Sequence, residues 1–211
     1  MFMLHCNKYI SNVFAFAILA SSTSYAVDSP GVIKQLISGG DPVAGKEKSA
    51  NCRGCHGEDG NSVASNSPKL AGQYSDYILS QINNFQTGTR KNPTMTGIVA
   101  TLTSKRDLID MAAYFASQKQ MTGIPSNNLI GQNLNLKYGC LGCHGEDGKG
   151  RPAYNSIFPV IGGQHKNYLV KQLKDFKSGA RDTDVSGAMS ELTKKMTNDE
   201  IEAISDFLSG L

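Results

Sequence analysis

A nine-residue motif that occurs twice in this 211-residue chain constrains its fold more than any other feature. The motif reads Cys-x-x-Cys-His-Gly-Glu-Asp-Gly and occupies residues 52–60 and 140–148. Positions i, i+3 and i+4 of a helix lie on one face, so a helical copy presents two thiols and an imidazole on the same side. Two thiols at this spacing match the two vinyl groups on one edge of a porphyrin, and the adjacent imidazole can bind the iron.

The Cys-x-x-Cys-His pattern is the attachment site of a c-type haem. Each copy supplies the thiols for two thioether bonds and a neutral imidazole as an axial ligand. The sequence therefore predicts two covalently bound haem c groups, held by Cys52, Cys55 and His56 in the first copy and by Cys140, Cys143 and His144 in the second.

Two other interpretations of a Cys-x-x-Cys pair fit less well. A redox-active dithiol is expected near a βαβ pattern, and we find none in the sequence. A four-cysteine zinc site usually separates its pairs by about 15–20 residues, whereas Cys52 and Cys140 are 88 positions apart. Neither alternative requires a histidine directly after the second cysteine, and here the histidine occurs in both copies.

Residues 1–26 have the features of an export signal. They contain one lysine, no acidic residue, an apolar run at 13–20 and a small-x-small ending at Ala26. A transmembrane anchor is the alternative, but the run is well short of the roughly 20 residues that a membrane span needs. We expect cleavage after Ala26 and a mature protein that is soluble or peripherally associated with a membrane. Cleavage removes Cys6, so every remaining cysteine lies in a haem motif and none is left for a structural disulfide.

The charge of the chain indicates no particular class of partner. The full sequence has 21 Lys and Arg residues against 18 Asp and Glu residues, and the two propionates on each haem would offset this small excess. Binding to nucleic acid would require a clustered basic patch, which we do not find. We expect no nucleic-acid partner.

The internal repeat extends beyond the haem motifs. Residues 68–90 and 159–181 share the pattern Pro-x-x-x-Gly-Gln…Tyr…Gln…Phe-x-x-Gly-x-Arg at a constant offset of 91 positions. Two copies of one unit, each with its own haem, explain this pattern most simply. A turn-forming stretch at 122–128 separates the copies. We therefore expect three parts: a signal peptide at 1–26, one haem-binding domain at 27–124 and a second at 125–211.

Local patterns predict helices joined by long loops. Asp41-Pro42 is an N-cap followed by proline at the first helical position, and this helix should run into residues 52–56. Apolar residues at helical spacing predict a further helix over 75–85. Residues 27–40 show only a short apolar stretch that could form a packing helix.

The last helix of each half also has a clear start signal. In the first half it should begin at Thr103 or Ser104, and in the second half at Thr197, where Glu200 completes a capping box. No segment alternates convincingly as a strand would, so the expected fold class is all-α. Chains of roughly 90 residues bury only a modest fraction of their surface, and we expect each half to depend on its haem for part of its core.

The ligand opposite the histidine largely decides what a haem iron does. Methionine raises the potential and closes the site for electron transfer, whereas an open position permits oxygen or peroxide chemistry. Met95 and Met189 each lie eight positions before a helix-start threonine, Thr103 or Thr197, in copies that otherwise align. The repeat therefore predicts Met95 and Met189 as iron ligands on the loops that precede the last helices.

The other candidate ligands fit packing roles better. Met111 has core spacing on the last helix of the first half, Met196 aligns with the apolar Leu102, and Met121 lies near the linker. A methionine at a packing position more often fills a gap in the core. His165 follows a glutamine where the other copy has a tyrosine, and we expect it at the surface or the haem edge, not on the iron.

Taken together, these residues resemble the dihaem cytochromes c4, which consist of two class I cytochrome c domains in tandem. The match rests on the paired haem motif, the paired proline-to-arginine pattern and one methionine per half, and it covers nearly the whole mature chain. The resemblance implies that the carbonyls of Pro68 and Pro159 accept a hydrogen bond from Nδ1–H of the ligating histidines. It also implies that Arg90 and Arg181 lie near haem propionates and that the two haems face each other. The second half departs from the first by a longer loop at 182–187.

The resemblance implies a periplasmic electron carrier that passes single electrons from a quinol-oxidising membrane complex to a terminal oxidase or reductase. Haem attachment to this motif occurs on the outer side of the bacterial membrane, in agreement with the export signal. We expect no enzymatic activity, because the sequence shows no nucleophile–base pair or metal cluster outside the haem motifs. A dihaem cytochrome subunit of a dehydrogenase is one alternative. A dihaem peroxidase is another, and it would require one open iron.

Overall fold

The computed structural model describes residues 39–151, 158–184 and 186–211. The expected export signal and the unassigned stretch at its end, through residue 38, lie outside these residues. The described part consists of helices joined by turns and loops, and its one β-type pairing is an isolated antiparallel bridge between Arg90 and Arg181. The expected all-α fold class is confirmed.

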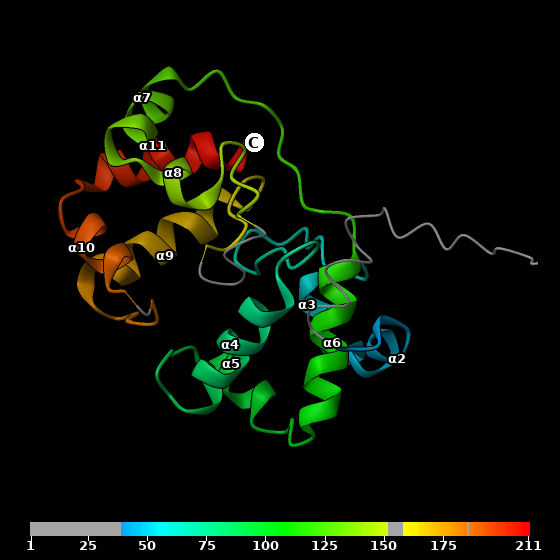
Figure 1. Cartoon of the computed structure of the whole chain (residues 1–211). Helices are drawn as coiled ribbons and strands as arrows, with labels where there is room; N and C mark the ends of the chain where they lie inside the picture. The colour runs from blue at the N-terminus through cyan, green and yellow to red at the C-terminus, as the bar shows by residue number, and fades with distance from the viewer. Residues whose placement is uncertain (1–38, 152–157, 185) are drawn as a thin grey trace, which may run out of the picture.

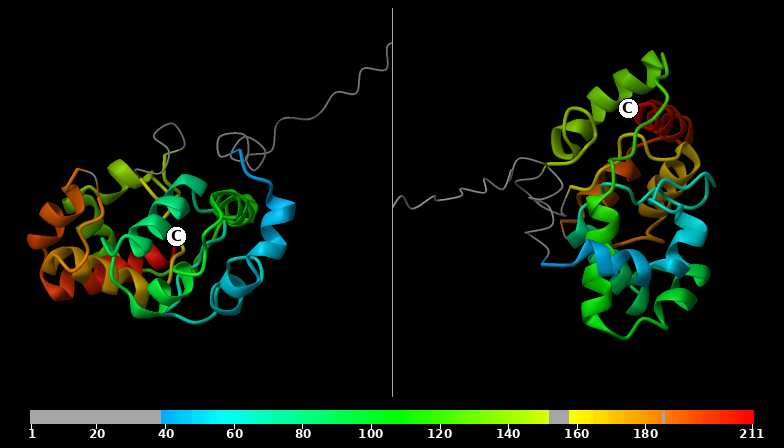
Figure 2. Two further views of the ribbon diagram at one scale, coloured as in Figure 1. Left: turned by 90° about the horizontal axis from the view of Figure 1, so that it is seen from below. Right: turned by 90° about the vertical axis from the view of Figure 1, so that its right-hand side faces the viewer.

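The helices form two groups, one from each half of the chain, which lie side by side (Figure 1) and partly overlap in the perpendicular views (Figure 2). The first group comprises α2 (Pro42–Lys48), α3 (Ala50–His56), α4 (Ser75–Gln86), α5 (Pro93–Val99) and α6 (Lys105–Ser117). The second group comprises α7 (Leu129–Tyr138), α8 (Cys140–His144), α9 (Lys166–Ser178), α10 (Ala188–Lys194) and α11 (Asn198–Ser209). An extended stretch between α6 and α7 joins them (Figure 1).

The start signals of the last helices are confirmed. Ser104 is the N-cap of α6, and its side chain accepts a hydrogen bond from the Asp107 N–H. Thr197 caps α11, and Glu200 completes the capping box. These signals are short-range, because a cap depends only on side chains within the first turn of its own helix.

The single helix expected from residue 42 to residue 56 is wrong, because α2 and α3 are separate. The Asp41 side chain caps α2 as expected, but the chain leaves helical geometry at Ser49. The Ser49 hydroxyl donates to the Lys46 carbonyl oxygen at 3.0 Å, a local bond that competes with the helix ladder. In the second half a glycine in the left-handed region, Gly139, makes the corresponding break between α7 and α8.

The first and last helices of each half cross at a glycine. A β-carbon at Gly45 of α2 would lie 1.9 Å from the Asp110 carbonyl oxygen of α6, and one at Gly131 of α7 would lie 2.2 Å from the Ala203 carbonyl oxygen of α11. Real β-carbons do not approach an oxygen so closely, so only glycine permits these two crossings. The two halves therefore use the same packing device between their first and last helices.

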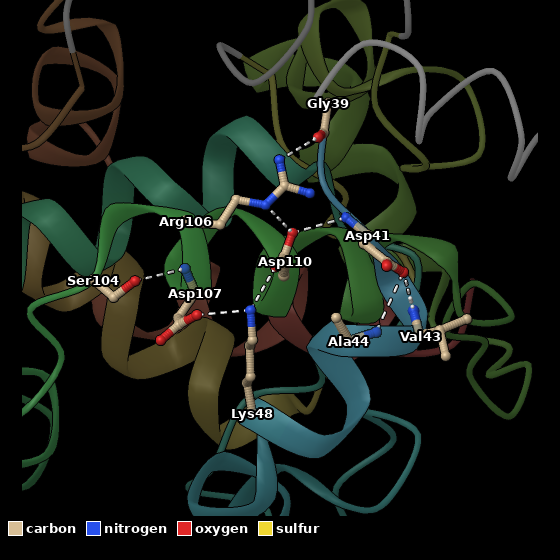
Figure 3. Close-up of polar contacts among 9 residues, drawn as sticks. All are labelled: Gly39, Asp41, Val43, Ala44, Lys48, Ser104, Arg106, Asp107 and Asp110. Carbon is tan, nitrogen blue, oxygen red and sulfur yellow. Dashed lines mark hydrogen bonds and ion pairs between the residues drawn. The ribbon is translucent and has the colours of Figure 1, made fainter.

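The buried carboxylate of Asp110 fastens α2 to α6 in the first half (Figure 3). Its side chain is 2% exposed. Its oxygens accept a hydrogen bond from the Asp41 N–H at 2.9 Å and pair with Lys48 Nζ at 2.7 Å and Arg106 Nε at 3.0 Å. Two cations and a backbone amide thus compensate one carboxylate that has been removed from water.

This environment shifts the titration of Asp110. Burial alone would raise the pKa of its carboxyl, but the hydrogen bonds from the Asp41 N–H, Lys48 and Arg106 outweigh burial and hold the pKa below its ordinary value. A carboxyl with a depressed pKa in the folded state stabilises the fold above its unfolded pKa of about 3.9. That contribution is lost as the pH falls through the folded-state pKa.

Replacing Asp110 with asparagine should therefore lower the free energy of unfolding of the first half by about 1–3 kcal/mol at pH 7. The difference from the wild type should shrink as the pH falls below about 4, because the wild-type carboxyl is then being protonated. Denaturant melts of the holoprotein from pH 3 to pH 7 measure both effects. Asp107→Asn is the matched control, because Asp107 also pairs with Lys48 but is 45% exposed; it should melt close to the wild type. If the loss of unfolding free energy in Asp110→Asn did not change with pH, the stabilising role of the Asp110 charge would be contradicted.

Candidate haem-binding site

One cavity of about 920 Å³ is lined by the donor residues of both halves. It lies where the two groups of helices meet, and both groups contribute residues to its lining. The donors predicted from the sequence that line it are Cys52, Cys55, His56 and Met95 of the first half and Cys140, Cys143, His144 and Met189 of the second. The structure thus brings all eight together around one space.

Both histidines are buried and fixed through one ring nitrogen. His56 Nδ1 lies 2.7 Å from the Pro68 carbonyl oxygen, and His144 Nδ1 lies 2.8 Å from that of Pro159. A carbonyl can only accept, so Nδ1 carries the proton and Nε2 keeps the lone pair that a metal requires. Burial lowers the pKa of both imidazoles, and the hydrogen bond to the carbonyl only partly offsets this. The rings are therefore neutral at pH 7.

The thiols do not have the character of a redox-active dithiol. Burial raises the pKa of Cys52 and raises that of Cys140 to about 11, whereas catalytic dithiols have lowered values. Cys55 and Cys143 are exposed, and all four thiols are free. Within residues 39–151, 158–184 and 186–211, no three His, Cys, Asp or Glu side chains cluster as a metal ion would need. The raised pKa values of Cys52 and Cys140 therefore argue against a redox-active dithiol.

The two methionines predicted as ligands lie in short helices, not in loops as expected. Met95 is in α5, where the Asn92 side chain accepts from the Met95 N–H at 3.0 Å. Met189 is in α10, where the Asp184 carboxylate accepts from the Met189 N–H at 2.7 Å. Asn92-Pro93 is an N-cap followed by proline, so the sequence did contain a signal for α5 that the repeat argument overlooked.

The other methionines of the described residues are buried, and two of them, Met111 and Met196, also line the cavity. Met111 and Met196 are each 3% exposed, and Met121 is fully buried. Met196 belongs to the core of the second half. Met121 packs between the halves with Tyr74 and Val160.

Two glutamines reach across the interface and bind the backbone of the opposite half. Gln73 donates through Nε2 to the Val160 carbonyl at 2.9 Å and accepts from the Val160 N–H at 3.0 Å. Gln164 makes the same pair of bonds to Lys69, each at 2.9 Å. Both glutamines are 4% exposed, so these four hydrogen bonds are shielded from water.

The backbone that each glutamine binds is the one that orients a histidine. Lys69 and Val160 directly follow Pro68 and Pro159, whose carbonyls accept from the two rings. Each half therefore supports the histidine loop of the other half. The sequence pattern contained both glutamines, but nothing in one copy indicates that their partners lie in the other.

A second set of exchanged contacts surrounds Arg90 and Arg181, which are 8% and 6% exposed. Gln81 Oε1 accepts from Arg90 Nη1 at 2.8 Å and from Arg181 Nη2 at 3.1 Å. Gln172 Oε1 accepts from Arg181 Nη1 at 2.8 Å and from Arg90 Nη2 at 2.5 Å. Two neutral amide oxygens thus bridge two buried cations from opposite halves.

Tyrosines complete the arrangement, again across the interface. Arg90 donates to the Tyr168 hydroxyl at 2.9 Å, and Arg181 donates to the Tyr77 hydroxyl at 3.0 Å. Neither arginine forms an ion pair with a carboxylate in the part of the chain that the structure describes. Two buried guanidinium groups without carboxylate partners, both lining the cavity, are suited to bind the propionates of a haem.

His165 also contributes to the interface. The ring is half-buried, and its Nε2 lies 2.9 Å from both the hydroxyl and the carbonyl oxygen of Ser62 in the other half. It does not line the cavity. Its partner could not be anticipated from the repeat, because the equivalent position of the first copy is Tyr74.

Comparisons with known proteins agree with the presence of two haem motifs. The cytochrome c family profile matches residues 43–119 and 130–211, each of which contains one haem motif. Cytochrome c4 of Pseudomonas aeruginosa is 43% identical over 182 residues, covering 82% of this chain and 89% of that protein. The crystal structure of reduced recombinant cytochrome c4 from Pseudomonas stutzeri has a TM-score of 0.75 and 41% identity, and covers 82% of this chain and 99% of that one.

A further relative is a thiosulfate dehydrogenase electron acceptor of Stutzerimonas stutzeri. It is 29% identical over 212 residues, covering 92% of this chain and 91% of that protein. The family match in two segments, together with the two complete motifs, means that the chain binds two covalent haem groups.

Gln73→Ala should accelerate amide hydrogen exchange in the opposite half more than in its own half. The Val160 N–H loses its buried acceptor, so its hydrogen exchange in the holoprotein should accelerate by about five- to thirtyfold, the effect of one to two kcal/mol. Gln164→Ala should do the same at Lys69. Gln120→Ala is the control, because that side chain reaches only Gly72 in its own half, at 3.5 Å. Unchanged exchange at Val160 in Gln73→Ala would show that the contact contributes nothing.

Proposed function

The chain is a member of the cytochrome c4 family, a dihaem electron-transfer cytochrome, and we propose that it is a periplasmic carrier. In this role it takes single electrons from a quinol-oxidising membrane complex and passes them to a terminal oxidase or reductase. The observation that supports the proposal most directly is the cavity, where each half contributes one histidine and the methionine that the repeat predicts as a ligand, Met95 or Met189, besides a second methionine at a packing position. Two irons that are both closed by such ligands transfer electrons and bind no substrate.

Each bound haem supplies one iron that alternates between the ferrous and ferric states. His56 and His144 offer Nε2 to the iron, because Nδ1–H is held by a carbonyl oxygen. Met95 and Met189 offer thioethers, which favour the ferrous state and raise the potential. Cys52, Cys55, Cys140 and Cys143 form the thioether links. None of these groups gains or loses a proton in the electron-transfer step.

The arginines and prolines that line the cavity have supporting roles. Arg90 and Arg181 hold the propionates, in accordance with the absence of ion pairs to carboxylates described above. Pro68 and Pro159 orient the histidine rings. The domains extend over 27–124 and 125–211, and the export signal at 1–26 directs the chain to the periplasm. No helix in the described residues is long and apolar enough to cross a membrane.

A dedicated cytochrome subunit is the second candidate. It is favoured by the similarity to a thiosulfate dehydrogenase electron acceptor at 29% identity. In that case the donor would be a periplasmic dehydrogenase instead of a quinol-oxidising complex. Anaerobic mixing of the oxidised holoprotein with each donor decides between them: faster reduction by the membrane complex supports the carrier, and faster reduction by the dehydrogenase supports the subunit.

The mature protein should contain two haems and accept two electrons per chain, because each half has a complete attachment motif. Mass spectrometry of the mature chain gives the haem count, and a potentiometric titration with spectra gives the number of electrons. The reduced wild-type protein should not bind carbon monoxide. Binding at either haem would reveal an open iron and would favour a peroxidase over a carrier.

Met95→Ala should open one iron and Met189→Ala the other, with the second haem of each variant still six-coordinate. Loss of the thioether removes stabilisation of the ferrous state, so the potential of the affected haem should fall. The emptied site should also bind carbon monoxide when reduced. Met111→Leu and Met196→Leu are the matched controls; each should lose less than about 1.5 kcal/mol of stability and keep unaltered haem spectra. If Met196→Leu opened an iron while Met189→Ala did not, the ligand assignment in the second half would be wrong.

A further inference from the structure

One contact across the interface has different chemistry in the two halves. His165, at the start of α9, binds Ser62 of the first half. Tyr74, its counterpart in the repeat, donates through its hydroxyl to the Lys149 carbonyl oxygen at 3.3 Å. Lys149 occupies the position of Asn61 in the second motif, directly beside that of Ser62. The loop that follows each haem motif is therefore held by the opposite half, through an imidazole in one case and a phenol in the other.

The hydrogen bonds around Ser62 fix the tautomer of His165. The Ser62 side chain is 4% exposed, and its hydroxyl donates its one proton to the Ser67 carbonyl oxygen at 2.6 Å. The ring nitrogen Nε2 of His165 lies 2.9 Å from both the hydroxyl and the carbonyl oxygen of Ser62, so Nε2 carries the proton that these oxygens accept. The lone pair is then on Nδ1, which is where a second proton binds.

The same hydrogen bonds lead to the predicted iron ligand of the first half. Ser67 directly precedes Pro68, whose carbonyl oxygen lies 2.7 Å from His56 Nδ1. His165 thus fixes Ser62, Ser62 fixes the peptide group before Pro68, and Pro68 orients His56. Tyr74 provides no titrating group at the other loop, because burial raises the pKa of its hydroxyl above the ordinary value.

A proton on His165 would meet charge of its own sign. Lys69 lies on the opposing loop, and its charge disfavours protonation of the ring; Lys69 forms no ion pair with the described residues. His165 is also the N-cap of α9, the positive end of the helix dipole. The nearest carboxylates are engaged elsewhere: Asp206 pairs with Lys166 at 3.0 Å, and Asp59 accepts from the backbone of its own turn.

The contact therefore loses stability in acid. Burial lowers the pKa of His165, Lys69 lowers it further, and the hydrogen bond to Ser62 only partly offsets this. Below about pH 6.5 the unfolded chain consequently binds more protons at this position than the folded chain does. A histidine with a lowered pKa in the folded state stabilises the fold above that pH and loses this contribution as the pH falls through the folded-state pKa.

We propose that His165 is a pH-sensitive positioning residue for the haem of the first half: a proton bound at Nδ1 loosens the loop at 62–68 and raises the reduction potential of that haem. This rests on the proposed function, in which His56 binds the iron. A carbonyl that accepts from Nδ1–H makes the imidazole a more basic ligand and favours ferric iron, so loosening Pro68 favours ferrous iron. The added positive charge acts in the same direction. The first haem thus accepts an electron more readily in acid, and the second does not share this response.

Potentiometric titrations of the full-length holoprotein between pH 4 and pH 8 test the proposal. One of the two potentials should rise as the pH falls below about 6.5, the ordinary pKa of a histidine, and should level off once His165 is protonated. Haem propionates also titrate in both halves, so the wild type is compared with His165→Gln, which cannot take up a proton. The variant should match the wild type at pH 8 and lack the additional rise in acid. An equal rise in both proteins overturns the proposal.

Two further comparisons keep the test valid and identify the haem. His165→Tyr introduces the residue of the first copy; it should also lack the additional rise, and it replaces His165→Gln if glutamine impairs folding. In Met189→Ala the remaining six-coordinate haem belongs to the first half and should keep the additional rise. In Met95→Ala it belongs to the second half and should not show it. The reverse pattern overturns the assignment to the first half.

Ser62→Ala separates positioning from the charge alone. It removes the hydroxyl between His165 and Ser67 and leaves the Ser62 carbonyl in place, so the rise in acid should become smaller. Ser65→Ala is the matched control, because the Ser65 hydroxyl accepts from Asn167 of α9 at 3.0 Å and this contact has no titrating group; the rise should remain complete. A complete rise in Ser62→Ala would mean that the proton acts through space only, and the positioning role would be wrong.

The outcomes also distinguish this inference from the proposed function. Two reversible one-electron steps with the same pH profile in the wild type and in His165→Gln would refute the role of His165 and leave the carrier function intact. A wild-type protein without two such steps would instead refute the carrier function itself.

Discussion

The exchanged glutamine bonds are the interaction on which the arrangement of the two haem sites depends. Gln73 and Gln164 each bind both polar groups of one residue in the opposite half, and that residue follows the proline whose carbonyl orients a histidine. Separation of the halves would replace these four hydrogen bonds by bonds to water, at a net cost of about 0.5–1.5 kcal/mol each, and would release both histidine loops. The interface thus couples the orientation of the two histidines.

The buried apolar cluster of each half is small among the described residues. The buried apolar cluster of the first half has four residues, Ile78, Ala112, Tyr114 and Phe115, and that of the second has six. The cavity between them is lined by apolar side chains as well as by the ligands. Small chains usually need an additional stabilising element, and a covalently attached macrocycle is such an element.

The sequence predicted those features that have a local or a repeated signal. Ser104 and Thr197 cap their helices through contacts within one turn. Met95 and Met189 are predicted as ligands because they occupy matching positions in the two copies, and both line the cavity. The break at Ser49 was missed although its bond to Lys46 is local, because a serine inside a helical pattern does not by itself predict an interruption. The pairing of Gln73 with Val160 was missed because a repeat shows which residues recur without showing which copy they contact. His165 was predicted at the surface or the haem edge, and its contact with Ser62 in the other half was missed because the equivalent position of the first copy is Tyr74.

The symmetry of the interface has an evolutionary consequence. Gln73 and Gln164, Arg90 and Arg181, and Tyr77 and Tyr168 all exchange partners at one constant offset, which is how the isologous contact of a two-fold homodimer is built. A single half with this surface would pair with a second copy of itself, and the linker makes that pairing independent of concentration. Gene fusion also removes a restriction: a homodimer must place the same residue at both sites, whereas one chain can keep Asn92 in one half and Asp184 in the other. Tandem duplication thus turned a symmetric pair into a molecule with two distinguishable ends.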